Sequence, residues 1–410
     1  MKAVFTICAK NYLSHARTLG DSIKKIHPDI DFSILLSDEV DGFIDLQKEK
    51  HRIVEFKTIE REIYKDLAFK YDVLEFSTSV KPFYFHYLFK HEKYDKVIYL
   101  DPDIYVYNSL DYVFNLLDDN FLILTPHFTR MDLNDSGPIR EETILFVGIY
   151  NLGFAAFSNK PEALQVIEWW KKRLQDKCYV DRENALHVDQ KWMDLIPSYF
   201  NSGVHITRHT GLNISHCNMH QRKLTKDKQT YLVDGKPLIF FHFTGFDPKN
   251  PDSITKPGRQ TTVTLKDMPE YKDIFYDYAK CLYNNNYEKI SKSTYFYNNF
   301  ENGINIFQFQ RRYYRAINLK FDNPFSISEG SFYNKLQKNG LIINEKKQVI
   351  TNLRGKELAG FDRKKRMLIN GLYLLKKLFG IKNYILLMSF LKANSDPEKQ
   401  LFVFKNEVKK

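Results

Sequence analysis

The order of the first hydrophobic segments is the feature that most constrains the fold. Residues 3–9 form an apolar, β-prone run, and a second apolar run covers residues 32–36. Between them, apolar side chains recur at steps of three or four from Leu13 to Ile26, which is the helical period. A strand, a helix and a strand in this order begin a parallel sheet, because parallel neighbours require a crossover connection. The sequence therefore predicts an α/β fold.

The alternation of strands and helices continues to about residue 260. Short apolar runs typical of buried strands lie at residues 97–100, 121–125, 153–157 and 238–243. Segments with helical spacing lie at 79–91 and 161–175. After Pro257 and Gly258 the strand signals fade, and apolar residues recur at helical intervals. We predict an α/β domain over residues 1–260 and a mainly helical domain over residues 261–410.

Positive charge is concentrated at the carboxyl end. The chain has 61 Lys and Arg against 50 Asp and Glu, a net charge of +11, and residues 350–410 hold 14 of the basic and 5 of the acidic side chains. The main body is nearly neutral, which argues against a nucleic-acid-binding protein. Residues 363–391 have the pattern of a basic amphipathic helix. Two interpretations stay open: contact with an anionic membrane surface, or packing on the helical domain.

Cysteine spacing and hydropathy indicate the compartment. The four cysteines lie far apart and form no CxxC pair, so neither a disulfide framework nor a structural zinc site is predicted. No run approaches the ~20 apolar residues of a membrane span, and the first residues lack a signal-peptide pattern. We predict a cytoplasmic protein.

Two carboxylates follow the most apolar strand-like segment. Asp101 and Asp103 come directly after residues 96–100, and their i, i+2 spacing places both on one face of an extended chain. The carboxyl end of a strand in a parallel sheet is where ligands bind, and paired carboxylates there can hold a divalent cation. Asp-x-Asp alone is a weak signal, but its position after a buried strand strengthens it.

Three further polar signals each have an ordinary structural explanation. His242 interrupts an apolar strand just before Gly245 and is compatible with a hydrogen-bonded core histidine. Asp189 and Gln190 begin a helix-like stretch, where an acid can be an N-cap. The Asn-Leu-Gly sequence at residues 151–153 is compatible with a turn. With a carboxylate pair elsewhere, however, His242 becomes a candidate third metal ligand.

The order of these signals carries more information than each signal alone. Together with residues 6–12 and the Val-Lys-Pro sequence at 80–82, they occur in the order found in GT-A glycosyltransferases. The chain resembles the family 8 type, the relatives of glycogenin and lipopolysaccharide galactosyltransferases, over roughly residues 1–250. The resemblance implies a GT-A (Rossmann-like) nucleotide-sugar-binding domain followed by the helical carboxyl-terminal domain.

The resemblance also implies a role for each matching residue. Asp101, Asp103 and His242 look like metal ligands, and Asp101 also lies near the donor ribose. Asp189 and Gln190 would sit by the anomeric carbon as the catalytic pair. The remaining donor contacts would come from Thr6, Asn11, Tyr12, Lys81, Asn151, Gly153 and Gly245. One departure is Pro248, where the family often has a Lys; Lys249 follows one position later.

A polar stretch between these motifs adds two candidates. Residues 211–222 are rich in Asn, His and Arg, and Asn218 and His220 are candidate contacts to the donor or acceptor sugar. Ordinary turn residues in a surface loop are the alternative.

The function implied is transfer of a sugar from a nucleotide-sugar, with a UDP-sugar as the expected donor, to a glycan or lipid-linked glycan in the bacterial cytoplasm. The resemblance implies Mn²⁺ or Mg²⁺ and retention of the anomeric configuration. Three alternatives stay open. One is an inverting enzyme with Asp189 as base. The second is a sugar nucleotidyltransferase, although residues 9–12 lack the Gly of its phosphate-binding loop. The third is a non-catalytic protein that binds membrane or nucleic acid through its basic segment.

Overall fold

The computed structural model describes residues 1–134, 137–228, 230–255, 264–343 and 361–404. The chain forms two compact units, Met1–Phe296 and Tyr297–Lys410. The first unit is built on a mixed sheet, and the second is helical, so the prediction of an α/β fold with a helical carboxyl-terminal region is confirmed.

Seven strands form the central sheet of the first unit, in the order β10-β6-β7-β4-β1-β2-β3. The strands are β1 Lys2–Cys8, β2 Asp31–Leu36, β3 Arg52–Glu55, β4 Lys96–Leu100, β6 Leu122–Leu124, β7 Phe154–Ser158 and β10 Val204–Ile206. Neighbours are parallel except at β7, which runs antiparallel to both β4 and β6. The direction of β7 brings the residues before it to the edge where β4 ends.

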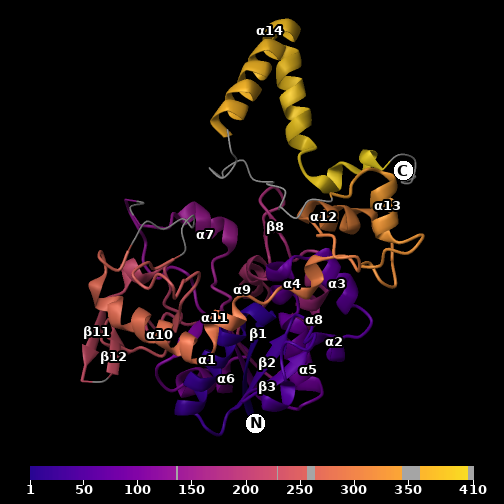
Figure 1. Cartoon of the computed structure of the whole chain (residues 1–410). Helices are drawn as coiled ribbons and strands as arrows, with labels where there is room; N and C mark the ends of the chain where they lie inside the picture. Colours follow the sequence, from indigo (N-terminus) through magenta and orange to yellow (C-terminus); the bar gives the residue numbers. More distant parts are fainter. Residues whose placement is uncertain (135–136, 229, 256–263, 344–360, 405–410) are drawn as a thin grey trace. The chain divides into compact units, whose positions relative to one another are not determined.

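Helices cover both faces of this sheet because side chains of β1 alternate between them. Val4 packs in one core cluster with residues of α1 (Leu13–Ile26) and α6 (Asp111–Asp119). Phe5 faces the other way, and its ring centroid lies 4.9 Å and 4.8 Å from those of Tyr84 and Phe85 in α5 (Lys81–Lys90). Helix α5 in turn packs on α8 (Pro161–Leu174). Figure 1 shows these helix pairs on opposite sides of β1, β2 and β3.

Shorter elements complete the first unit. Its shorter helices are α2 Phe56–Ile59, α3 Tyr64–Lys70, α4 Val73–Ser79, α7 Glu141–Val147, α9 Ile196–Tyr199 and α11 Tyr287–Ile290. Its small sheets pair β8 Val180–Asp181 with β9 Leu186–His187, join β11 Leu224–Asp227, β12 Thr230–Val233 and β13 Lys236–Pro237, and pair β5 Ile104–Val106 with β14 Phe240–His242. The last pair is antiparallel and sets His242 opposite Ile104.

The division between the units lies after Phe296, whereas the sequence placed a boundary near residue 260. The difference has a packing cause. Helix α10 (Lys272–Asn284) buries Phe275 and Tyr278 in an aromatic cluster with Phe243, and the rings of Phe243 and Tyr278 stack at 3.8 Å. Residues 264–296 therefore share a core with β14, although their composition lacks strand signals.

The second unit contains α12 (Gln308–Ile317), α13 (Phe332–Lys338) and α14 (Phe361–Ala393). The basic helix predicted for residues 363–391 lies within α14, which is interrupted at Gly380, where φ is +75°. Large apolar side chains along α14 are exposed, among them Leu374, Leu378 and Phe379. Among the described residues, no helix is long and apolar enough to cross a membrane.

Replacement of Gly20 by Ala should destabilise the first unit. Gly20 lies inside α1, and a Cβ there would come within 2.5 Å of Phe32 and 2.7 Å of His51. The clash should cost more free energy than Ala gains in helix propensity. We expect the free energy of unfolding, measured by urea denaturation, to fall by about 1–3 kcal/mol. Gly371→Ala is the control, because its Cβ would meet nothing within 4 Å. Equal stability of the two variants would contradict the packing of α1 on β2.

Candidate metal centre

Three acidic and imidazole side chains meet at the carboxyl end of β4. Ligand atoms of Asp101, Asp103 and His242 lie within 4.8 Å of one another. His242 Nε2 is 3.1 Å from an Asp103 oxygen and 3.5 Å from an Asp101 oxygen. The structure therefore brings together the residues that the sequence nominated as metal ligands.

Backbone hydrogen bonds fix the positions of these residues. Strand β4 ends at Leu100, and the amide of Asp101 then donates to the carbonyl of Gly153 at 2.8 Å. The amide of Phe243 donates to the carbonyl of Asp103, also at 2.8 Å. Because both bonds are made by the backbones of the two aspartates, and one of them joins Asp103 to the residue after His242, the separation of the carboxylates from the imidazole depends on backbone pairing.

Asn213 orients the imidazole. Its amide nitrogen donates to Thr125 Oγ1 at 2.8 Å and to the carbonyl of Asn151 at 3.0 Å, so its oxygen is the atom that faces His242 Nδ1, 3.2 Å away. Nδ1 must then carry a proton and donate. Nε2 is left to face the carboxylates, as in metal sites where an outer residue fixes the histidine tautomer.

The electrostatics of the cluster favour added positive charge. Burial lowers the pKa of His242, but the charges of Asp103 and Asp101 outweigh burial and raise it. Burial in turn raises the pKa of Asp103, and His242 reverses that effect and lowers it overall. Two carboxylates and an imidazole nitrogen are a donor set that suits a divalent cation, so the residues fit a metal site.

Gly153 lies directly against the imidazole. A Cβ at this position would come within 2.3 Å of Cε1 and 2.6 Å of Nδ1 of His242. The amide of Gly153 donates to the side-chain oxygen of Asn151 at 3.0 Å, which closes the turn before β7. The Asn-x-Gly sequence thus has a packing role at the cluster; its proposed contact with a sugar stays a prediction.

A buried ion pair adjoins the cluster. Lys81 at the start of α5 donates to the carboxylate of Asp189 and, at 2.9 Å, to the carbonyl of Leu152. The side chains of Lys81 and Asp189 are 1% and 3% exposed. Burial raises the pKa of Asp189, and Lys81 opposes the rise. Lys81 also lies 4.1 Å from the ring centroid of Tyr99, whose hydroxyl donates to Asp101.

Gln190 supports the same turn from the other side. Its side-chain oxygen accepts from the amide of Leu152 at 3.0 Å, and its nitrogen donates to the carbonyl of Val147 at 2.9 Å. Asp189 and Gln190 are thus both engaged by protein groups. Neither side chain is free to contact a ligand in this structure, and the catalytic roles of both residues stay a prediction.

The candidate base-binding residues lie at the end of β1. Thr6 is fully buried, and its hydroxyl has no hydrogen-bond partner among the described residues. Asn11 and Tyr12 line a cavity of about 240 Å³, which Lys249 also lines. Gly245 follows β14 with a φ of +73°, a conformation that favours glycine. These positions are compatible with a nucleotide beside the cluster.

Asn218 and His220 lie away from the ligand atoms. The Asn218 amide donates to the carbonyls of His127 and Asn213 at 3.1 Å and 3.2 Å and accepts from Ser215, so it holds the loop that carries Asn213. His220 packs edge-to-face on Phe128 at 5.8 Å, and burial lowers its pKa. The contact of either residue with a sugar stays a prediction.

The sequence did not nominate Asn213, Tyr99 or Tyr278. Asn213 lies in the polar stretch 211–222 and has a φ of +51°, an unusual conformation that Asn tolerates. Tyr99 looked like an ordinary strand residue. Tyr278 is far along the chain, and its buried hydroxyl has no hydrogen-bond partner among the described residues.

Comparisons with known proteins give relatives of low similarity. No family model matches the chain. The uncharacterized protein YfnF of Bacillus subtilis (strain 168) is 28% identical over 281 residues, which cover 67% of this chain and 90% of YfnF. Among solved structures, the galactosyltransferase LgtC in complex with donor and acceptor sugar analogues is 17% identical, with a TM-score of 0.40 over 68% of this chain and 95% of LgtC. The glycosyltransferase GlyE of Streptococcus pneumoniae TIGR4 is 18% identical, with a TM-score of 0.40 over 73% of this chain and 68% of GlyE. These scores are too low to assign a family.

Gly153→Ala should weaken cation binding without removing a ligand. The added methyl group would displace the imidazole of His242, so the affinity for Mn²⁺, measured by isothermal titration calorimetry, should fall about 10- to 100-fold. Gly371→Ala should bind Mn²⁺ as the wild type does, and Asp103→Ala should show no binding. Unchanged affinity in a folded Gly153→Ala protein would show that His242 is not a ligand.

Proposed function

We propose that the protein is a metal-dependent GT-A glycosyltransferase that moves a sugar from a nucleotide-sugar to a glycan or lipid-linked glycan. The donor that we expect is a UDP-sugar. The observation that carries the proposal is the cluster of Asp101, Asp103 and His242 at the carboxyl end of β4. Nucleotides bind at this edge of an α/β sheet, and the ligand atoms of the three side chains fit Mn²⁺ or Mg²⁺. The order of motifs along the chain adds support.

The chemistry follows from the charges at the site. Breaking the bond between a sugar and a diphosphate leaves negative charge on the phosphate, and a bound divalent cation supplies Lewis-acid stabilisation of that charge. Asp101, Asp103 and His242 would hold the cation. Thr6, Asn11 and Tyr12 would hold the nucleoside, and the ammonium of Lys81 would add positive charge beside the phosphates.

We favour retention of the anomeric configuration. An inverting reaction needs a carboxylate that accepts a proton from the acceptor, and Asp189 is the candidate. Its carboxylate is buried and bound by Lys81, so it is poorly placed to remove a proton from an acceptor. In a retaining reaction Asp189 and Gln190 would stabilise positive charge that develops at the anomeric carbon.

Nucleotide-sugar binding should depend on both metal and Asp103. We expect one UDP-sugar, from a panel that includes GDP-, CMP- and dTDP-sugars, to raise the melting temperature with Mn²⁺ and not with EDTA. A ligand at a hundredfold excess over its Kd stabilises the folded state by about 2.7 kcal/mol, enough to detect. Asp103→Ala should lose the response.

Asp119→Ala is the matched control, since Asp119 is an exposed acid at the end of α6. It should respond as the wild type does. No shift with any nucleotide-sugar under any metal condition would reject the proposed function. A shift that persists in Asp103→Ala would place the nucleotide elsewhere.

We also propose that α14 contacts the inner face of the cytoplasmic membrane, where a lipid-linked acceptor would lie. Residues 363–393 contain eight basic and no acidic side chains. Exposed apolar residues accompany them, including Met367, Leu374, Leu378 and Phe390. Exposed apolar and basic groups on one helix are the pattern of an interfacial segment, which binds acyl chains and anionic headgroups together.

Vesicle flotation tests this contact. The full chain should float with vesicles of one part phosphatidylglycerol to three parts phosphatidylcholine and bind pure phosphatidylcholine at least tenfold more weakly, because each basic residue contributes about 1 kcal/mol at an anionic surface. Substitution of Lys364, Lys365, Lys376 and Lys377 by Gln should abolish the preference. The control substitutes four exposed lysines of the first unit: Lys93, Lys172, Lys177 and Lys228. Equal losses in both variants would reject a specific role for α14.

A further inference from the structure

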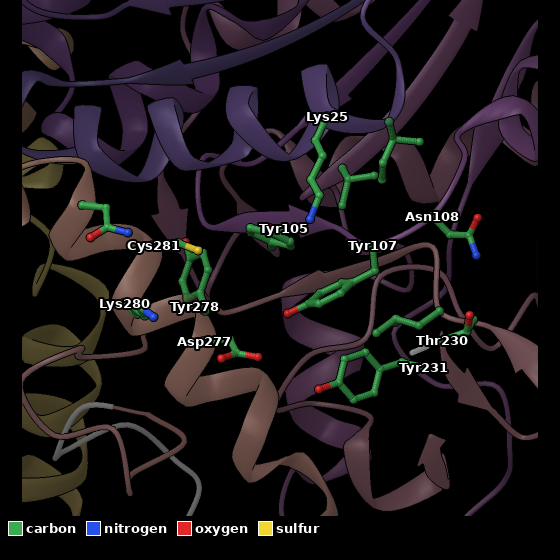
Figure 2. Close-up of a pocket in the computed structure, with 14 residues that line it drawn as sticks. Lys25, Tyr105, Tyr107, Asn108, Thr230, Tyr231, Asp277, Tyr278, Lys280 and Cys281 are labelled. Carbon is green, nitrogen blue, oxygen red and sulfur yellow. The ribbon is translucent and has the colours of Figure 1, made fainter. Parts of the chain in front are cut away.

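A second cavity lies beside β5, and its lining includes the buried side chains of Leu238 and Tyr278. It has a volume of about 630 Å³ and is lined by the end of α1, by β5 and the residues after it, by β12, and by α10 (Figure 2). All of these elements belong to the first unit. None of the proposed metal ligands or nucleotide contacts lines this cleft.

Tyrosine rings form one wall of the cleft. The rings of Tyr105 and Tyr107 lie 4.8 Å apart, and Tyr107 meets the ring of Tyr231 edge-to-face at 5.7 Å. Tyr105 lies in β5 and Tyr107 directly follows it, so the alternation of an extended chain places both on one face, while Ile104 and Val106 belong to the core cluster of α1 and α6. Each tyrosine is partly buried and offers the cleft both an apolar ring and a polar hydroxyl.

Polar groups of the cleft have unused hydrogen-bonding capacity. In the part of the chain that the structure describes, the side chains of Lys25 and Asp277 and the hydroxyl of Tyr107 make neither a hydrogen bond nor an ion pair. In Figure 2, Lys25 comes from α1 and Asp277 from α10, on different sides of the cleft; the ring of Tyr107 lies between them in height, and Tyr231 lies below Tyr107. Burial raises the pKa of Tyr107, so its hydroxyl stays protonated and can both donate and accept.

The chemistry of the lining selects a class of ligand. Aromatic rings contact the apolar C–H face of a sugar, and an ammonium, a carboxylate and a phenol together donate to and accept from its hydroxyl groups. The lining contains two lysines and one aspartate and no arginine. This balance is a poor match for a phosphate or another strongly anionic ligand, which basic clusters recognise.

We propose that this cleft is a saccharide-binding site, separate from the metal centre, that holds a sugar residue of a glycan chain. The choice of a saccharide among polyhydroxylated ligands rests on the proposed function; the presence of a binding site does not. Tyr107, Asp277 and Lys25 supply its hydrogen bonds, and Tyr105 and Tyr231 supply its apolar surface.

The cleft is close to the metal centre in the fold. Tyr278 lines the cleft and stacks on Phe243, the residue after His242. On the opposite strand, Tyr105 lies two residues after Asp103. A glycan held in the cleft would therefore be tethered beside the metal centre, which would raise the local concentration of an acceptor.

A glycan microarray of bacterial surface polysaccharide fragments tests the proposal. The full chain is applied in EDTA without nucleotide, so that binding at the metal centre does not contribute. The wild type should bind at least one fragment. Tyr107→Phe, which keeps the ring, and Asp277→Asn, which keeps the size, should each weaken binding about tenfold through the loss of one hydrogen-bonding or charged group. Asp273→Asn, an exposed acid one turn earlier on α10, should bind as the wild type does.

The outcomes separate this site from the proposed function. Binding that falls in the two cleft variants and persists in Asp103→Ala supports the cleft, even if no nucleotide-sugar is ever bound. Binding that falls in Asp103→Ala and persists in the cleft variants overturns the proposal, because the glycan then sits at the metal centre. No binding of the wild type to any fragment also overturns it. The cleft variants should keep the melting temperature and the nucleotide-sugar response of the wild type.

Discussion

The pairing of β5 with β14 is the interaction on which the candidate site depends. Strand β4 brings Asp101 and Asp103 to the edge of the sheet, but the third candidate ligand, His242, comes from a distant part of the chain. The register that sets His242 opposite Ile104, together with the bond from Phe243 to Asp103, brings the imidazole to the carboxylates. A shift of one residue would turn His242 to the opposite face of the strand.

The charges around the cluster explain why the chain can bury it. Three carboxylates, Asp101, Asp103 and Asp189, face one ammonium, Lys81, so the group carries two negative charges when His242 is neutral. A divalent cation at the proposed site would balance that charge. The Lys81–Asp189 pair is also fully desolvated, and loss of one partner of such a pair costs about 3–5 kcal/mol because the other charge is left buried. The pair therefore holds the turn at residues 151–153 against α5.

Much of this arrangement could be predicted from the sequence, because strands buried on both faces have a clear signature. The apolar segment before Asp101 and the one around His242 are both strands, and the helices predicted at 79–91 and 161–175 correspond to α5 and α8. Local patterns did not identify the partners that depend on tertiary packing. Asn213 is recognisable as an orienting residue from its contacts with His242 and Thr125, which lie far from it in the chain.

The boundary near residue 260 shows the same limit. Loss of strand signals after Pro257 describes local structure, whereas the extent of a domain depends on which core a helix joins. Tyr271, Ile274 and Phe275 of this segment are buried in the cluster that contains Phe241, so α10 belongs to the first unit. A composition rich in Tyr and Asn does not reveal which core the aromatic rings enter.

The long separation of the ligands has a consequence for how the protein is made. Asp103 and His242 are roughly 140 residues apart in the chain. A contact of this separation forms after the local elements of β1, α1 and β2, because a large loop must first be closed. On a ribosome, the first hundred or so residues emerge with the carboxylate pair but without its imidazole. The cluster is thus completed late in synthesis, after the segment that carries its two carboxylates has emerged.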